Sequence, residues 1–170
     1  MTDGKVLYLV VCAAPPALQV GELIDLLMSA GWTVCVIATP TAATWIDREA
    51  LSAQTGYPVR WEWRRPGEPD LLPQADAVLV APATFNTINK WALGISDNLA
   101  LGILNEALGL RLPTLIAPHA KPALTDHPTF TRNIDLLQLN GVAVAAADES
   151  QVFDHEHRPW LSIVKAMEGV

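Results

Sequence analysis

The residues best suited to chemistry in this chain gather directly after one apolar run. The run Ala77–Ala81 ends at Pro82. A polar cluster of Thr84, Asn86 and Thr87 follows and leads into a helical pattern. So short an apolar run predicts a strand covered on both faces. Hydroxyls, an amide and free backbone N–H groups then meet at the start of a helix, which predicts an anion-binding site at the carboxyl end of the strand.

Two other expected strand ends carry loops of a similar kind. The turn Ala13–Ala17 follows the first strand, and the hydroxyl-rich segment Thr39–Ile46 follows the second. Ligands of parallel sheets bind outside the carboxyl ends of the strands, so these loops suit a phosphate or a heteroaromatic ring. Trp45, in the second loop, is either a core residue, which the sequence alone favours, or a flat wall beside a planar ligand.

The positions of the histidines and the lack of common catalytic motifs limit the reactions that this chain could catalyse. The sequence has no P-loop lysine pattern, Gly-rich dinucleotide fingerprint, nucleophile elbow or zinc-ligand spacing. His155 and His157 flank a glutamate in a polar tail, which indicates a solvated segment rather than a metal site. His119 begins a loop, and His127 is the only histidine expected near the ligand edge. A structural role is favoured for His127, because its position is the only evidence.

Strands and helices are expected to alternate along the chain. The expected strands are Lys5–Cys12, Thr33–Ala38, an exposed Val59–Trp63 with Trp61 and Trp63 on one face, Ala77–Ala81, Pro113–Pro118 and Val142–Ala146. The first expected helix begins at Leu18 and ends before Gly31, and the second runs through Ala50 to Ser52. Two more are Thr87–Leu93 and Leu99–Leu108, the latter capped by Ser96 and Asp97. The last two are a helix capped by Asp126 that runs to Asn140, and Pro159–Met167.

This order predicts an α/β fold: a single-domain, open parallel sheet with helices on both faces, Rossmann-like and flavodoxin-like in its three layers. The length of 170 residues fits one domain. A formal net charge of −7 argues against a nucleic-acid partner. No segment has the length or apolarity of a membrane span or a signal peptide, so a cytoplasmic protein is expected. Cys12 and Cys35 are expected to be reduced and buried.

Two linked motifs carry a resemblance to a known family. Residues Ala81–Thr87 read Ala-Pro-Ala-Thr-Phe-Asn-Thr, and residues Gly94–Leu99 read Gly-Ile-Ser-Asp-Asn-Leu. Together they resemble the flavin-binding signature of the cysteine-decarboxylase flavoproteins. That family includes phosphopantothenoylcysteine decarboxylases and the enzymes that decarboxylate a C-terminal cysteine of lantibiotic precursor peptides. The likeness runs from about Lys5 to about Val144.

The resemblance implies bound FMN, less often FAD, in a homotrimer that can assemble into a dodecamer. It also assigns residues 1–147 to the flavoprotein domain, with residues 148–170 as a tail and short helix of the same domain. The first and second loops are expected along the ribityl phosphate, and Trp45 is expected to face the ring. The cofactor contacts carried over are Cys12, Ala13, Ala14, Thr39, Thr41, Trp45, Pro82, Ala83, Thr84, Asn86, Thr87, Asn98 and Ala123.

Catalysis in the family uses three residue types, and this chain departs from all of them. The position of the family's histidine base falls on Glu68 when the chain is read back from Pro82 without a gap. The position of the asparagine that binds the substrate carboxylate falls on Thr125, which is the expected substrate contact. The flap cysteine is absent, because no cysteine follows Cys35. His127 and Glu68 are therefore the acid–base candidates, and coenzyme A biosynthesis is disfavoured.

Two functions remain open at this point. The first is a flavin-dependent oxidative decarboxylase of a cysteine-containing substrate, with a peptide that ends in cysteine favoured over phosphopantothenoylcysteine. The alternative is a flavin-binding member of the family without decarboxylase activity, either a regulatory subunit of a mixed oligomer or a catalyst of a different flavin reaction. No metal is expected in either case.

Overall fold

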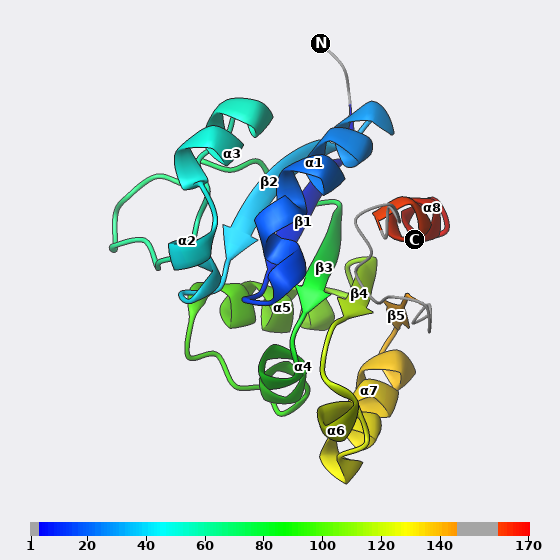
Figure 1. Cartoon of the computed structure of the whole chain (residues 1–170). Helices are drawn as coiled ribbons and strands as arrows, with labels where there is room; N and C mark the ends of the chain where they lie inside the picture. The colour runs from blue at the N-terminus through cyan, green and yellow to red at the C-terminus, as the bar shows by residue number, and fades with distance from the viewer. Residues whose placement is uncertain (1–3, 146–159) are drawn as a thin grey trace.

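Five parallel strands form the central sheet of the computed structural model, which describes residues 4–145 and 160–170. The strand order is β2-β1-β3-β4-β5, so β1 and β3 lie in the middle and all carboxyl ends meet at one edge (Figure 1). The predicted parallel α/β fold is confirmed. The strands are β1 (Val6–Val11), β2 (Thr33–Ala38), β3 (Ala77–Ala83), β4 (Thr114–Pro118) and β5 (Val142–Val144).

Helices cover both faces of the sheet. Side chains of α1, α3 and α8 join one core cluster, and side chains of α4, α5 and α7 join the other. Among the described residues no helix is long and apolar enough to cross a membrane. The helical elements are the 3₁₀ turn η1 (Pro15–Gln19), α1 (Val20–Ser29), α2 (Ala42–Trp45), α3 (Arg48–Thr55), α4 (Phe85–Ala92), α5 (Leu99–Leu110), α6 (Pro122–Thr125), α7 (Pro128–Leu139) and α8 (Trp160–Met167).

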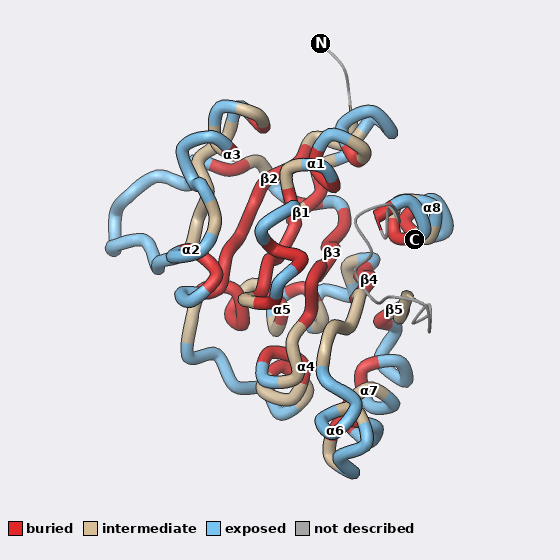
Figure 2. Tube along the Cα trace, viewed as in Figure 1, coloured by how far each residue is buried: buried red, intermediate tan, exposed pale blue. Residues whose placement is uncertain are grey.

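Alternate residues of the central strands feed the two cores. In β1, Leu7 and Leu9 belong to the cluster under α1 and α8, whereas Val10 belongs to the cluster under α4 and α5. Successive side chains of a strand point to opposite faces, so a strand with a core on both sides must be apolar throughout. Strand β3 is accordingly buried along its whole length, and β1 is buried except at Val6 and Tyr8, which are half-buried (Figure 2).

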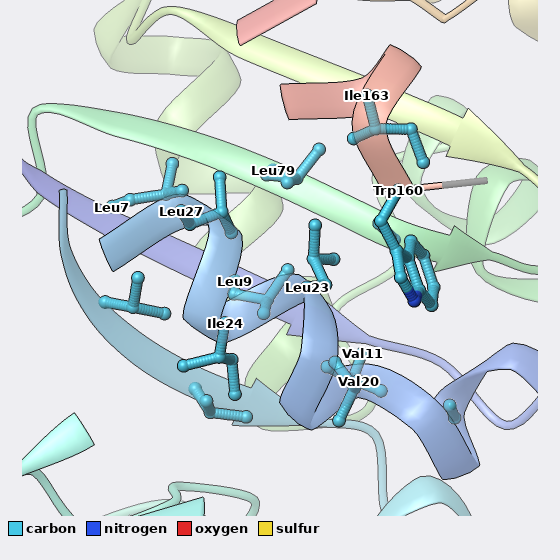
Figure 3. Close-up of a cluster of buried hydrophobic side chains, with 14 of the residues drawn as sticks. Leu7, Leu9, Val11, Val20, Leu23, Ile24, Leu27, Leu79, Trp160 and Ile163 are labelled. Atoms are coloured by element: carbon cyan, nitrogen blue, oxygen red, sulfur yellow. The ribbon is translucent and has the colours of Figure 1, made fainter. Parts of the chain in front are cut away.

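The first core depends on one stripe of α1. Val20, Leu23, Ile24 and Leu27 recur at intervals of three and four residues, which places them on one face of the helix. Figure 3 shows this stripe against the side chains of the sheet, with α8 beside it. Each fully buried side chain of this size stabilises the fold by about 1.5–3 kcal/mol.

The second core fixes the helix that follows β3. Trp91 of α4 is 1% exposed, and its indole N–H donates to the carbonyl oxygen of Leu104 in α5 at 2.9 Å. The side-chain amide of Asn133 in α7 donates to Asn89 of α4 at 2.8 Å. Helix α4 is thereby held by packing and hydrogen bonds to both neighbouring helices, which fixes its first turn at the edge of the sheet.

The expected strand Val59–Trp63 is wrong. Only Arg60 pairs with β2, through a single parallel bridge to Ile37, so the alternation of a strand does not continue. Trp61 packs with the first core, and its ring lies 5.1 Å from the guanidinium carbon of Arg48. Trp63 instead lies so close to Gly102 of α5 that a Cβ at this glycine would collide with the indole ring. The two tryptophans therefore do not share a face.

The start of α4 and the cap of α5 differ from the predictions by one or two residues. Helix α4 begins at Phe85 rather than Thr87, since Thr84 already has the extended backbone of an N-cap. Helix α5 is capped by Asn98 and not by Ser96 or Asp97: the Asn98 side-chain oxygen accepts the Leu101 N–H at 2.9 Å. The sequence offers three adjacent residues of good capping type, so propensity alone could not choose among them.

The cysteines and the terminal helix match the expectations. Cys12 and Cys35 are free and fully buried, and burial raises the pKa of both thiols, that of Cys35 to about 11. Helix α8 begins one residue after the expected Pro159. The predictions for His155, His157 and most of the tail lie outside the described residues.

Candidate cofactor site

Backbone hydrogen bonds join four strand-end loops at the carboxyl edge of the sheet. The Cys12 N–H donates to the Pro82 carbonyl oxygen at 3.2 Å, which ties the loop after β1 to the end of β3. The N–H of His119 donates to the carbonyl oxygen of Ala83 at 2.8 Å, which ties the loop after β4 to the same segment. The Thr39 N–H donates to Val11 at 3.0 Å. The segment Pro82–Thr87, called the cradle below, is central to this edge.

The first turn of α4 supplies the donors of the cradle. Thr84 is the N-cap, but its side chain makes no capping bond, and its hydroxyl donates to the Thr87 hydroxyl at 3.3 Å instead. The N–H groups of Phe85, Asn86 and Thr87 lie in the turn that has no intrahelical acceptors. Asn86 is exposed and Thr84 half-buried, so an amide, a hydroxyl and the positive end of the helix dipole face the same edge.

Buried side chains hold the cradle from inside. Pro82, Ala83 and Thr87 are buried, and Thr87 is 4% exposed. The Cys12 thiol is 0% exposed and lies within hydrogen-bonding reach of the Thr87 and Thr84 hydroxyls. Burial raises the pKa of this thiol more than these hydrogen bonds lower it. Cys12 therefore supports the cradle as a neutral thiol, and only its backbone and the exposed parts of the loop remain for a ligand.

The loop after β2 presents an aromatic ring to solvent. Trp45 ends α2 and is 46% exposed, so the alternative that it packs in the core is wrong. Thr39 is 8% exposed, and its hydroxyl oxygen accepts the Ala42 N–H at 3.3 Å, whereas Thr41 is exposed. An exposed indole beside the strand ends is the surface that a planar ring would cover.

The other expected cofactor contacts differ in how far they are exposed. Ala14 is 5% exposed and Ala13 half-buried, next to the exposed Pro15 that opens η1. Asn98 is half-buried and caps α5, so its side-chain oxygen already has a donor. Ala123 is exposed in α6. These assignments remain predictions, because no ligand contact tests them.

The residues present fit a flavin. Its ring needs hydrogen-bond donors for carbonyl oxygens and an apolar surface, and its phosphate needs free N–H groups. The first turn of α4, the exposed Asn86 amide and the Trp45 ring offer these features at one edge. Among the described residues no cluster of His, Cys, Asp or Glu could hold a metal ion.

The expected base and the expected substrate contact lie far apart in the sheet order. Glu68 is exposed in the connection between α3 and β3, and its carboxylate accepts the Arg65 N–H at 3.0 Å. That connection runs beyond β2, at the left of Figure 1. Thr125 lies in α6, after β4, and its hydroxyl donates to Pro122 at 3.0 Å. Strands β1 and β3 separate the two residues, so one protomer does not bring them together.

His127 caps α7. Its Nδ1 accepts the Thr129 N–H at 3.1 Å, so the expected cap Asp126 is wrong. The His127 ring meets the ring of Phe85 edge to face, with centroids 5.8 Å apart. The structure thus brings His127 next to the first turn of α4, as expected for a residue near the ligand edge, and also gives it the structural role that the sequence favoured.

A second histidine lies at the same edge, contrary to the expectation that His127 is alone there. His119 follows β4 directly and bonds through its backbone to Ala83 of the cradle. Its side chain is half-buried, and loss of hydration lowers the pKa of the imidazole. The sequence does contain one indication of this position, because His119 immediately follows Pro118, the last residue of a predicted strand.

Comparisons with known proteins find relatives along most of the chain. The chain is 31% identical over 147 residues to the coenzyme A biosynthesis bifunctional protein CoaBC of Bacillus subtilis, which covers 83% of the chain and 36% of that relative. The chain therefore spans about a third of the length of this longer protein. It is 29% identical to the probable phosphopantothenoylcysteine decarboxylase of Streptococcus mutans, over 81% of this chain and 79% of the other.

Two solved structures with the same fold are FMN-dependent cysteine decarboxylases. The FMN-dependent cysteine decarboxylase TvaF, from thioviridamide biosynthesis, superposes with a TM-score of 0.74 at 28% identity, over 84% of this chain and 90% of the other. The FMN-dependent cysteine decarboxylase SpaF gives a TM-score of 0.75 at 25% identity, over 85% and 84%. The family description "Flavoprotein" matches residues 1–169. The chain therefore belongs to the flavoprotein family, and the proteins similar to it include epidermin decarboxylase, the cysteine decarboxylase TvaF and a probable phosphopantothenoylcysteine decarboxylase.

Proposed function

We propose that this chain binds FMN in the cradle and catalyses the oxidative decarboxylation of a substrate that contains cysteine, with a peptide ending in cysteine favoured. The observation that carries the proposal is the uncapped first turn of α4, placed by β3 at the carboxyl edge of the sheet. Relatives with this fold are FMN-dependent cysteine decarboxylases. Bound FMN would supply a two-electron acceptor.

The residues of the chain would bind and orient this cofactor. The N–H groups at the start of α4 and the Asn86 amide would donate hydrogen bonds to it, and Trp45 would cover its planar surface and exclude water. Cys12 and Thr87 would keep the cradle rigid from inside. Thr125 is the proposed contact for the substrate carboxylate, and Glu68 and His127 remain acid–base candidates.

We also propose that the active form is a homo-oligomer, with a trimer as the expected unit. Two features support this. Glu68 and α6 lie on opposite sides of the two central strands, so a second copy is required if both act on one substrate. Large apolar side chains are also exposed, among them Trp45 at 46% and Leu93 at 59%. Size-exclusion chromatography with light scattering would give the mass of the assembly. A strict monomer that catalyses the reaction would contradict the proposed oligomer.

The experiment for the activity uses the purified, FMN-loaded protein and the peptide acetyl-Ala-Ala-Cys. Mass spectrometry should find a product lighter by carbon dioxide and two hydrogens. The matched control is acetyl-Ala-Ala-Ser, which lacks the sulfur that stabilises the carbanion and should remain unchanged. Phosphopantothenoylcysteine tests the less favoured substrate class. Failure of all cysteine substrates with FMN bound would contradict the proposed reaction but not the cofactor.

One observation favours the second candidate function, a flavin-binding subunit without decarboxylase activity. Glu68 stands where the resemblance expects a histidine base, and its exposed carboxylate is bonded to its own loop. Co-expression with a relative that carries the histidine would test this. Isolation of a mixed oligomer whose activity requires both chains would support it, whereas turnover by this chain alone would exclude it.

A further inference from the structure

A cavity of about 260 Å³ lies between helix α5 and the connection from α3 to β3. It shares no residue with the cradle. The floor of the cavity is aliphatic and is made of side chains from β2, the connection and α5: Ile37, Leu72, Leu99 and Ile103. The first three are buried and the last is half-buried. A floor of this kind suits an aliphatic group of a small ligand.

One wall of the cavity is the ring of Trp63, which lies against a glycine of α5. A Cβ at Gly102 would collide with the benzene end of the indole. Glycine weakens a helix interior relative to alanine, so Gly102 is locally unfavourable, and the space it leaves is filled by the Trp63 ring. Trp63 is 56% exposed, so its ring is both a wall of the cavity and part of the protein surface.

Two guanidinium groups line the cavity and have donors to spare. Arg60 donates to the Glu62 carbonyl oxygen at 3.3 Å and lies 3.8 Å from the Asp70 carboxylate. Arg64 donates to the Glu68 carbonyl oxygen at 2.8 Å and lies 3.3 Å from the same carboxylate. Among the described residues these are their only acceptors, although each guanidinium carries several more N–H groups. The remaining donors can bind the carboxylate of a ligand.

The charges on the lining of the cavity cancel. The exposed carboxylates of Asp70 and Glu106 oppose the guanidinium groups of Arg60 and Arg64, so the lining has no net charge. A ligand with a net charge would leave one charge without a counterpart, whereas a zwitterion pairs with both signs. The Tyr8 hydroxyl, which also lines the cavity, already donates to the Pro73 carbonyl oxygen at 2.8 Å. The charged groups therefore determine the polar part of the ligand.

We propose that this cavity binds a free aliphatic amino acid. The ligand carboxylate accepts hydrogen bonds from Arg60 and Arg64 of the connection, and the ammonium group pairs with Glu106 of α5. The aliphatic side chain lies on the floor beside Trp63. A ligand this small is expected to bind with a Kd between about 1 μM and 1 mM. The inference does not depend on FMN or on decarboxylation, because the cavity contains no residue of the cradle.

The first test follows ligand binding by NMR on the isotope-labelled, purified protein. L-Leucine should shift the indole N–H signal of Trp63 and leave that of Trp45 unchanged. Isocaproate, which lacks the ammonium group, and L-leucinamide, which lacks the carboxylate, are the matched controls. Each should bind at least about tenfold more weakly, because each loses one charged hydrogen-bonding group. An analogue that binds as tightly as leucine would overturn the assignment of a zwitterion.

The second test changes the lining of the cavity. Arg64→Gln should weaken leucine binding at least about tenfold. Arg65→Gln is the matched control and should bind leucine as the wild type does, because Arg65 does not line the cavity. Gly102→Ala should also weaken binding, since the new Cβ displaces the Trp63 ring. Its unfolding midpoint should not fall, because alanine favours the helix more than glycine does.

Three outcomes would overturn the site. The first is a leucine titration that shifts the Trp45 signal instead of that of Trp63, or shifts neither at about 10 mM. The second is equal affinity of Arg64→Gln and Arg65→Gln for leucine. The third is unchanged affinity in Gly102→Ala. None of these outcomes bears on FMN binding by the cradle, so the failure of this inference and the failure of the proposed function are distinguishable.

Discussion

The cradle and the connection between α3 and β3, residues 56–76, differ in what fixes them. The cradle follows a central strand, has three buried residues, and is bonded through its backbone to the loops after β1 and β4. In the connection, every residue from Glu62 to Leu71 is exposed, and its main-chain bonds to the sheet lie near its two ends, at Arg60 and at Asp76.

This difference accounts for which part of the family pattern the chain retains. Cofactor contacts that depend on packed backbone are constrained by the core as well as by the ligand, since most substitutions there also destabilise the fold. An exposed loop accepts other side chains with little effect on stability. Glu68 lies in such a loop, whereas Pro82 and Thr87 do not. Binding and catalysis can therefore diverge in one chain.

The largest effect is expected when the support of the cradle is removed. Trp91→Ala should lower the free energy of unfolding by about 3–5 kcal/mol, because it leaves a cavity and removes the hydrogen bond from the indole to the Leu104 carbonyl oxygen. Thermal unfolding followed by circular dichroism should show a midpoint lower by about 10 °C. The matched control is Trp63→Ala in the connection, where the ring is 56% exposed. Equal losses of stability in the two variants would contradict the difference between the cradle and the connection.

Removal of the cap of α5 should have an intermediate effect. Asn98→Ala deletes the acceptor of the Leu101 N–H and should destabilise the protein by about 1 kcal/mol in urea unfolding. Asn98→Asp is the matched variant, because aspartate caps as well as asparagine. If Asn98 also contacts the cofactor, as the resemblance implies, Asn98→Ala should weaken FMN binding beyond this loss of stability.

One half-buried hydroxyl anchors the end of the connection to the sheet. The Tyr8 hydroxyl donates to the Pro73 carbonyl oxygen at 2.8 Å, so Tyr8→Phe should destabilise the protein by about 1 kcal/mol. Burial, followed by Asp70 and Cys35, raises the pKa of Tyr8 from 10.0 to about 12. The folded protein therefore retains this proton longer than the unfolded chain, and stability falls as the pH rises from 10 to 12.

Tyr8→Phe should reduce this alkaline loss of stability. Urea unfolding at pH 8 and pH 11 measures it, and Tyr57→Phe is the control, because it removes a tyrosine hydroxyl at a different position. An alkaline loss that is as steep in Tyr8→Phe as in wild type would show that the hydroxyl does not anchor the connection.

The smallest effect is expected in the connection itself. Glu68→Ala should change the unfolding midpoint by no more than about 2 °C, because its carboxylate is exposed and bonded only to the local Arg65 N–H. FMN content should also stay at the wild-type level. Loss of FMN from this variant would show that the connection takes part in cofactor binding and would remove the contrast with the cradle.

The sequence predicted the sheet because its strands are apolar on both faces and the breaks between them are strong. The cradle could be predicted for the same reason: Pro82 ends an apolar run, and polar residues begin a helix immediately afterwards. Trp45 could not be placed, since composition does not distinguish a core indole from one that faces a planar ligand. The 46% exposure of Trp45 shows that it is not a core residue.

Other parts depend on contacts that residue type does not encode. The alternation at Val59–Trp63 matched a strand, but only Arg60 reaches the edge of β2, and the two tryptophans pack on different elements. The position of His119 at the carboxyl edge was not predicted because it depends on a backbone bond to Ala83, a residue 36 positions earlier. Such pairings across strands follow from the strand order and not from local pattern.

The most direct test of the central claim, that the cradle binds FMN, is the absorption spectrum of the purified chain. We expect the two visible and near-ultraviolet bands of oxidised flavin, one flavin per chain, and FMN as the compound released on denaturation. A colourless protein that takes up no FMN on reconstitution, although it is folded and oligomeric, would contradict it.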